Sequence, residues 1–135
     1  MGAARFPKVG DVMAKDVVCL DADESIESAC KTMAERKIGS VVVTVEGKPA
    51  GIFTERDLLT KVYLKGVDMK SAKLRDFMSA PLITIRPNVS VREAARIMRQ
   101  MKVRRLPVLD EQGKLVGIFT SADLATAIAE YTMEV

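Results

Sequence analysis

The feature that most constrains how this chain can fold is an internal duplication. Asp11-Val12-Met13 recurs 65 positions later as Asp76-Phe77-Met78. After one inserted residue the offset becomes 66, and Gly51-Ile52-Phe53-Thr54 matches Gly117-Ile118-Phe119-Thr120. The same two offsets pair Ser25 with Ser90, Ala29 with Ala94, Met33 with Met98, Lys37 with Lys102, Val43 with Val108 and Asp57 with Asp123. A collinear series of this kind indicates a tandem repeat, with copies at residues 1–66 and 67–135.

Each copy predicts the element order βαββα. A short extended run comes first, and an apolar spacing of helical period follows from Ser25 to about Arg36 and again from Ser90. The second helix begins with Ser90-Val91-Arg92-Glu93, which has the form of a capping box. The expected strands are Val17–Leu20, Ser40–Val45 and Pro49–Phe53 in the first copy and Leu82–Ile85, Arg105–Leu109 and Leu115–Phe119 in the second, and closing helices start at Glu55 and Ser121.

A three-stranded sheet with so few residues around it cannot bury both of its faces. We therefore expect the two sheets to pack on each other about a pseudo-twofold axis. The predicted fold class is α+β, with the two copies together forming one compact module.

The composition disfavours several classes of function. The chain has no histidine, the commonest general base and transition-metal ligand, and neither Cys19 nor Cys30 has the neighbouring cysteine of a zinc or redox site. We expect both to be buried free thiols. No P-loop, Ser-His-Asp set or catalytic carboxylate pair can be assembled, so neither catalysis nor a metal site is expected.

Charge and hydropathy suggest where such a chain works. A net charge of +3 is too small to require a polyanionic partner. No apolar run approaches the roughly 20 residues that span a bilayer, and Met1-Gly2-Ala3-Ala4-Arg5 lacks the apolar stretch of a signal peptide. The expected location is the cytoplasm, without membrane contact.

The segments Gly51–Asp57 and Gly117–Asp123 carry the most information about function. Each places Thr at the start of an expected helix and Asp three residues later, an arrangement that caps free N–H groups and suits the helix dipole. The acid is Asp in both copies, although Glu reaches back more readily in a capping box. A short carboxylate at a helix start could instead accept hydrogen bonds from both hydroxyls of a ribose.

The pattern Gly-apolar-apolar-Thr-x-x-Asp, closing a βαββα unit twice in tandem, resembles the CBS domain pair, or Bateman module. The resemblance extends from about Val9 to Leu124 and the last helix. It implies adenine-nucleotide binding, with AMP, ADP or ATP held between the repeats and no obligatory cofactor. By this resemblance the ribose is held by Thr120 and Asp123 in one cleft and by Thr54 and Asp57 in the other, the adenine rests on Val17, Ile38 and Ile118, and the phosphates face Arg104 and Arg105.

The first copy departs from the family pattern at the phosphate position, so the two clefts are expected to be unequal. Ile38-Gly39-Ser40 stands in the first copy where the second has Val103-Arg104-Arg105. Arginine forks suit phosphate oxygens, so tighter binding is expected at Asp123 than at Asp57.

The resulting prediction is a nucleotide-sensing regulatory module, homodimeric and acting on an unidentified protein. Three alternatives stay open. The motifs could only cap helices in a ligand-free interaction scaffold. The pI of about 8.9 and the arginines Arg92, Arg96 and Arg99 suggest nucleic acid, although two Tyr and four Phe offer few stacking platforms. S-adenosylmethionine could use the same ribose and adenine contacts, leaving the arginine pair without a phosphate.

Overall fold

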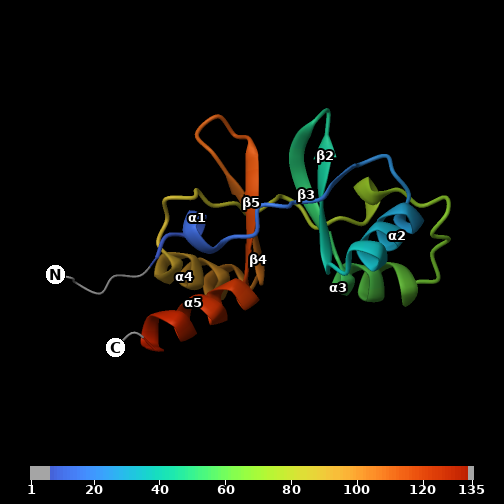
Figure 1. Cartoon of the computed structure of the whole chain (residues 1–135). Helices are drawn as coiled ribbons and strands as arrows, with labels where there is room; N and C mark the ends of the chain where they lie inside the picture. Colours follow the sequence, from blue (N-terminus) through green and yellow to red (C-terminus); the bar gives the residue numbers. More distant parts are fainter. Residues whose placement is uncertain (1–6, 134–135) are drawn as a thin grey trace. The chain divides into compact units, whose positions relative to one another are not determined.

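Two small sheets, each with its own helices, make up the computed structural model, which describes residues 7–133 and only the backbone of 131–133 (Figure 1). In the first sheet, β1 (Cys19–Asp21) runs parallel to β2 (Ser40–Val45), and β2 is antiparallel to β3 (Lys48–Thr54). The second sheet pairs β4 (Arg105–Leu109) with β5 (Leu115–Thr120), also antiparallel. The α+β class predicted from the sequence is therefore confirmed.

The two long helices of the repeats begin where the sequence predicts. Helix α2 (Ile26–Arg36) is capped by Ser25, whose hydroxyl accepts from the Ser28 N–H at 3.0 Å, and α4 (Val91–Met101) is capped in the same way by Ser90. The predicted capping box of α4 is only half formed. The carboxylate of Glu93 accepts from Arg96 Nε at 2.9 Å rather than from the Ser90 N–H, because a cation three residues along the helix offers a charged donor.

The closing helices of the two repeats differ in form. In the first repeat, α3 (Glu55–Asp57) continues directly into a π-helix over Leu58–Tyr63, whereas in the second repeat α5 (Ser121–Met133) is a continuous α-helix. Two short helices complete the structure, α1 (Val9–Val12) and a 3₁₀ turn over Leu74–Asp76. None of the helices described between residues 7 and 133 is long and apolar enough to cross a membrane.

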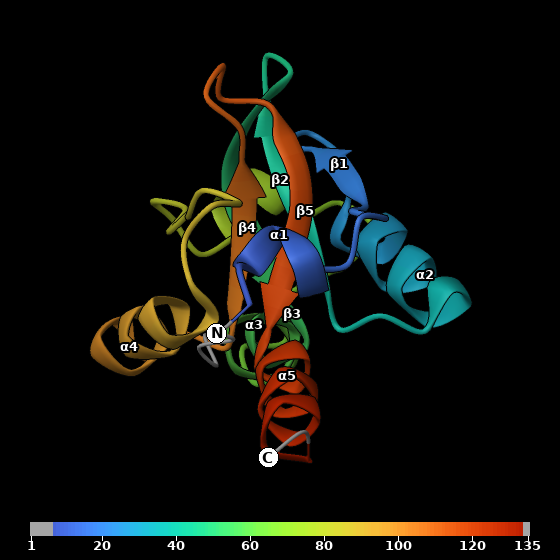
Figure 2. The same ribbon diagram turned by 60° about the vertical axis from the view of Figure 1, so that its left-hand side comes forward.

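The compact units of the structure are not the sequential halves 1–66 and 67–135. One unit is residues 18–82, and the other joins the described part of 1–17 to residues 83–133. The cause is an exchange of hydrogen bonds: the N–H groups of Val9 and Gly10 donate to carbonyls at Val89 and Pro87 (2.8 Å each), while Leu74 N–H donates to the Glu24 carbonyl (2.9 Å). Figure 2 shows α1 in front of β5, which it contacts. The leading segment of each repeat thus packs with the other repeat.

A close backbone approach explains the glycine that begins each repeated motif. Ile52 and Ser79 exchange two backbone hydrogen bonds (3.0 and 2.7 Å), and Ile118 and Ala14 do the same (2.9 and 3.0 Å). A Cβ on Gly51 would lie 2.9 Å from the Ser79 carbonyl oxygen, and one on Gly117 would lie 2.8 Å from that of Ala14. Only glycine lets the crossing segment come this near.

The strand predicted over Leu82–Ile85 is wrong. Its residues form no strand, and only Ile85 bridges β4, donating to the Pro107 carbonyl (3.1 Å) and accepting from the Leu109 N–H (2.9 Å). The segment lies between Pro81 and Pro87, neither of which has an N–H to extend a ladder. The second sheet consequently has two strands where the first has three.

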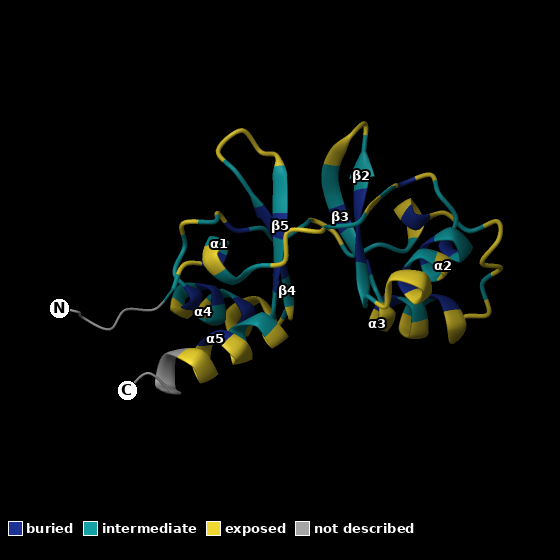
Figure 3. Cartoon of the chain, in the orientation of Figure 1, coloured by how far each residue is buried: buried dark blue, intermediate teal, exposed yellow. Residues whose placement is uncertain are grey.

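Each unit has its own apolar core (Figure 3). Phe53 and Phe119, which occupy the same place in the repeated motif, are both fully buried. The predicted helical faces are confirmed, since buried residues recur at helical spacing in both helices: Ile26, Ala29 and Met33 in α2, and Val91, Ala94 and Met98 in α4. The packing of the two sheets about a pseudo-twofold axis stays a prediction.

The cysteines differ from expectation. Cys19 is exposed, because β1 is an edge strand whose residues alternate between exposed and half-buried. Cys30 is partly buried in α2, and burial, with a smaller effect of the Glu27 carboxylate, raises the pKa of its thiol. Both are free thiols. The N-terminal stretch Met1–Arg5, read above for a targeting signal, lies outside the described residues.

Candidate functional site

The Thr-x-x-Asp motif of the second repeat joins the end of β5 to the start of α5. The Thr120 hydroxyl accepts from the Asp123 N–H (3.3 Å), and Asp123 Oδ2 accepts from the Thr120 N–H (2.9 Å) and hydroxyl (3.1 Å). This is a complete capping box at a helix N-terminus, where a carboxylate is also favoured by the helix dipole.

The first repeat builds the same box between β3 and α3. Asp57 Oδ2 accepts from the Thr54 N–H (3.0 Å) and hydroxyl (3.2 Å), and the Thr54 hydroxyl accepts from the Asp57 N–H (3.2 Å). The capping role that the sequence predicts for Thr and Asp is therefore confirmed in both copies, although Glu reaches back more readily in a capping box. Capping uses only Oδ2 in each case, so any further chemistry depends on Oδ1.

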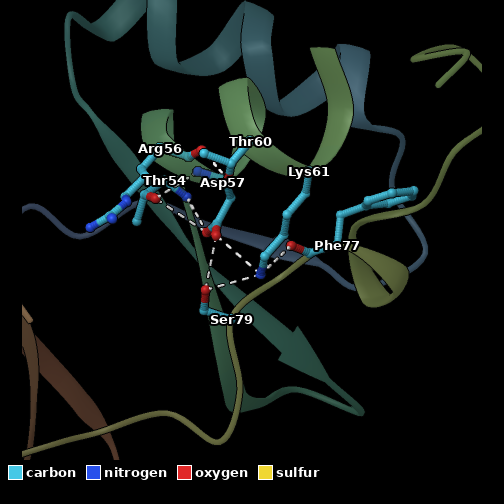
Figure 4. Close-up of polar contacts among 7 residues, drawn as sticks. All are labelled: Thr54, Arg56, Asp57, Thr60, Lys61, Phe77 and Ser79. Atoms are coloured by element: carbon cyan, nitrogen blue, oxygen red, sulfur yellow. Dashed lines mark hydrogen bonds and ion pairs between the residues drawn. The ribbon is translucent and has the colours of Figure 1, made fainter. Parts of the chain in front are cut away.

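The two aspartates differ at Oδ1 (Figure 4). Oδ1 of Asp57 accepts from the Ser79 hydroxyl at 2.9 Å and forms an ion pair with Lys61 Nζ at 3.1 Å. Asp57 is 5% exposed and is the buried charged residue of the described chain. Asp123 is half-buried, and among the residues that the structure describes no donor or cation contacts its Oδ1.

The reason for this difference can be read from the repeat. Lys61 and Ser79 correspond, at the offsets of 66 and 65, to Ala127 and Ala14. Neither alanine can donate a hydrogen bond from its side chain. Lys61 and Ser79 are not among the residues predicted from the sequence, although the replacement of a cation and a hydroxyl by two alanines between the copies is a signal that points to them.

The predicted phosphate-binding arginines adjoin the cap of the second repeat. Arg105 lies directly opposite Thr120 in the β4–β5 register, and the Arg104 carbonyl accepts from the Ser121 N–H at 2.9 Å. Cross-strand partners present their side chains on the same face of a sheet. Within residues 7–133 neither guanidinium forms a hydrogen bond or an ion pair. In the first repeat the residue opposite Thr54 is Ser40, so the same position there carries no charge.

The predicted adenine-binding residues are divided between the two units. Val17 and Ile118 belong to one unit, where Ile118 is half-buried at the centre of β5. Ile38 belongs to the other unit, where its N–H donates to the Met33 carbonyl at 3.0 Å. Their assembly into one adenine pocket stays a prediction, as does ligand binding at each of the named residues.

The arginines of α4 line a depression of about 390 Å³ with Ser90, Glu93 and Ala95. Arg96 is hydrogen-bonded to Glu93, and this bond, followed by the charge of the guanidinium, holds the pKa of the Glu93 carboxyl below its usual value. A carboxylate within the depression weakens its attraction for a polyanion. Among the described residues no group of three His, Cys, Asp or Glu side chains could hold a metal ion.

Comparisons with known proteins agree with the repeat. A model of the CBS domain matches residues 9–63 and 74–130. The chain is 40% identical over 121 residues to an uncharacterised protein of Methanopyrus kandleri, covering 89% of this chain and 62% of that protein. It is 34% identical over 110 residues to inosine-5'-monophosphate dehydrogenase of Korarchaeum cryptofilum, covering 82% of this chain but 22% of the dehydrogenase. The structure resembles that of a CBS-domain containing protein from Agrobacterium tumefaciens with a TM-score of 0.82 at 34% identity, covering 95% and 96% of the two chains.

Proposed function

Because this chain belongs to the CBS-domain family, we propose that it is a regulatory module that binds an adenine nucleotide, AMP, ADP or ATP, in the cytoplasm. The observation that carries the proposal is that, within the described residues, Oδ1 of Asp123 has no donor or cation and the two arginines beside the same helix cap form no side-chain hydrogen bond or ion pair. The match to the dehydrogenase covers only a minor part of that enzyme, which supports binding and regulation rather than catalysis by this chain.

The chemistry of the cap suits a ribose. Oδ1 of Asp123 can accept hydrogen bonds from the vicinal hydroxyls while Oδ2 keeps its bonds to Thr120, so binding need not dismantle the helix cap. The Thr120 hydroxyl lies 3.1 Å from Oδ2 and can turn toward a ligand. Charge-assisted hydrogen bonds of this kind are about twice as strong as neutral ones.

The arginines favour a phosphorylated ligand. A guanidinium is a planar fork of donors that matches the oxygens of a phosphate, and Arg105 faces Thr120 across the two strands. S-adenosylmethionine would instead bring a sulfonium cation toward two cations. We therefore consider S-adenosylmethionine a less favoured ligand than the nucleotides, and nucleic acid less favoured than either.

A homodimer is part of the proposal. Three large apolar side chains at the end of the first closing helix are strongly exposed in the described chain: Leu59 (58%), Tyr63 (75%) and Leu64 (74%). A second copy of the chain would cover them. Ligand binding would regulate a partner only through a difference in affinity between two states of the assembly.

Isothermal titration calorimetry with AMP, ADP, ATP and S-adenosylmethionine tests the proposal. Asp123→Asn keeps the size of the side chain but removes the charge, and we expect the affinity for the nucleotide to fall at least about tenfold. Asp57→Asn is the matched control in the other repeat and should leave the affinity within about twofold. Flat titrations of folded, ligand-free wild-type protein with every nucleotide would contradict the proposal.

A second variant identifies the phosphate contact. Arg105→Gln should weaken binding of ADP or ATP while leaving adenosine unchanged, because only the phosphates meet the guanidinium. Equal losses for ADP and adenosine would assign Arg105 a structural role. The competing function, a scaffold in which both motifs only cap helices, is favoured by the complete capping boxes and predicts no binding in any of these titrations.

A further inference from the structure

We propose that Lys61 and Ser79 close the carboxylate of Asp57 to ligands, so that the chain binds one nucleotide, at Asp123. This inference rests on the proposed function and restricts it to one of the two repeated motifs. It concerns the first repeat, where the family motif is intact in sequence but its aspartate is already engaged.

Every bond that a ribose would need from Asp57 is already made within the chain. Oδ2 accepts from Thr54, and Oδ1 is shared between the Ser79 hydroxyl and Lys61 Nζ. The side chain is buried, whereas that of Lys61 is 37% exposed. A ligand would therefore have to displace a hydroxyl and separate an ion pair that is partly shielded from water, and it would leave the ammonium without its partner.

The groups that cover Asp57 are fixed from two directions. Lys61 lies on the π-helix, four residues after Asp57, and its Nζ also donates to the Phe77 carbonyl and the Ser79 hydroxyl, each at 3.3 Å (Figure 4). The backbone of Ser79 is held to β3 by its two hydrogen bonds with Ile52. The covering groups therefore sit on a helix and on a segment bonded to a strand rather than on a free loop, and opening the site would break the side-chain bonds of Lys61 and Ser79 together.

The second repeat supplies an internal comparison. Ala14 has the same two-bond backbone contact with β5 that Ser79 has with β3, so the crossing segment occupies the same place in both copies. At this place a methyl group stands where Ser79 has its hydroxyl, and Ala127 on the α-helix α5 corresponds in sequence to Lys61 on the π-helix. The difference between the two aspartates thus combines two side-chain replacements with a closing helix of different form.

The stoichiometry of binding tests the inference on the intact chain. Calorimetry with ADP should give one site per chain for the wild-type protein, one site of at least about tenfold lower affinity for Asp123→Asn, and one unchanged site for Asp57→Asn. Two sites per chain, or equal losses in the two Asn variants, would overturn the inference while leaving nucleotide binding established. Failure of the wild-type protein to bind would instead contradict the proposed function.

A gain-of-site experiment tests the two closing side chains themselves. Ser40→Arg gives the first repeat the cation that Arg105 supplies in the second, and we expect this variant alone to keep one site. Adding Lys61→Met and Ser79→Ala should raise the stoichiometry toward two. A single site in the folded triple variant, or two sites in Ser40→Arg alone, would show that Lys61 and Ser79 are not what closes Asp57. If the triple variant fails to fold, the stoichiometries of the wild-type protein and of Asp57→Asn still show whether Asp57 binds a nucleotide.

Discussion

At the scale of single residues, the positions of the repeated motif, Gly51–Asp57 and Gly117–Asp123, have different structural roles. Gly51 and Gly117 admit the crossing segment, Phe53 and Phe119 fill the two cores, and the threonine and aspartate that follow cap a helix. In the described chain both carboxylate oxygens of Asp57 are engaged, whereas capping leaves Oδ1 of Asp123 without a contact. Most atoms of this family motif therefore have a structural role.

Gly117→Ala tests the packing role of the glycine. The added methyl group would lie 2.5 Å from Met13 Sδ and 2.8 Å from the Ala14 carbonyl oxygen, and the backbone oxygen cannot turn aside as the thioether can. We expect a loss of stability of about 1–3 kcal/mol in urea unfolding. Met13→Ala in the same chain should restore only part of the loss. If Gly117→Ala were as stable as the wild-type protein, the segment around Ala14 would have to move away from β5 without loss of stability.

The threonines and aspartates of the candidate site were predictable from the sequence as helix caps, whereas Lys61 and Ser79 were not. The threonines and aspartates recur in both copies, so alignment of the copies reveals them. Lys61 and Ser79 are instead a difference between the copies. In addition, Ser79 contacts Asp57 from 22 positions away, through a crossing of the chain that no local sequence pattern encodes. Contacts made by exchanged segments depend on tertiary structure, which explains the omission.

At the scale of elements, α2 and α4 end alike, each at a lysine in the left-handed conformation. Lys37 has φ 56° and Lys102 has φ 57°, values that favour glycine because a Cβ is crowded there. The helices and the hairpin strands were predictable because apolar periodicity and turn residues coincide. The π-helix at Leu58–Tyr63 could not be predicted, because its departure from α-helical hydrogen bonding does not change the spacing of the apolar residues.

Lys37→Gly and Lys102→Gly test the strain at these two helix ends. Glycine adopts the left-handed conformation without a Cβ clash, so each change should stabilise the protein by about 1 kcal/mol. Thermal unfolding of the two single variants and the double variant would measure the effect, and the two increments should add because the two lysines belong to different compact units. A lower melting temperature in either variant would indicate that the lysine side chain makes a stabilising contribution larger than the strain.

At the scale of the whole molecule, the chain folds across its own repeat boundary. Leu74 is fully buried in the core of the first repeat although it belongs by sequence to the second copy, and Val9 is fully buried in the core of the second repeat. The repeat itself was evident from the sequence. The packing of each leading segment on the other repeat was not evident. The two leading segments have nearly equivalent sequences, so the apolar pattern is satisfied whichever repeat each one packs on.

Fragments with different ends test this exchange. A fragment of residues 18–82 retains the segment that packs on the first repeat and should unfold cooperatively in urea, monitored by circular dichroism. A fragment of residues 1–66 follows the repeat boundary but lacks Leu74 and the Ile52–Ser79 hydrogen bonds, and should be largely unfolded. Equal stability of the two fragments would contradict the assignment of residues 74–82 to the first core.

The exchange also sets an order of events during synthesis. Residues 18–82 carry everything their core requires, so this unit can form as soon as residue 82 has emerged from the ribosome. The segment around Val9 emerges earlier still, but its hydrogen-bonding partners Pro87, Val89 and Ile118 are translated much later. The segment around Val9 must therefore wait for the second repeat, and until that repeat is made it lacks the residues on which it packs.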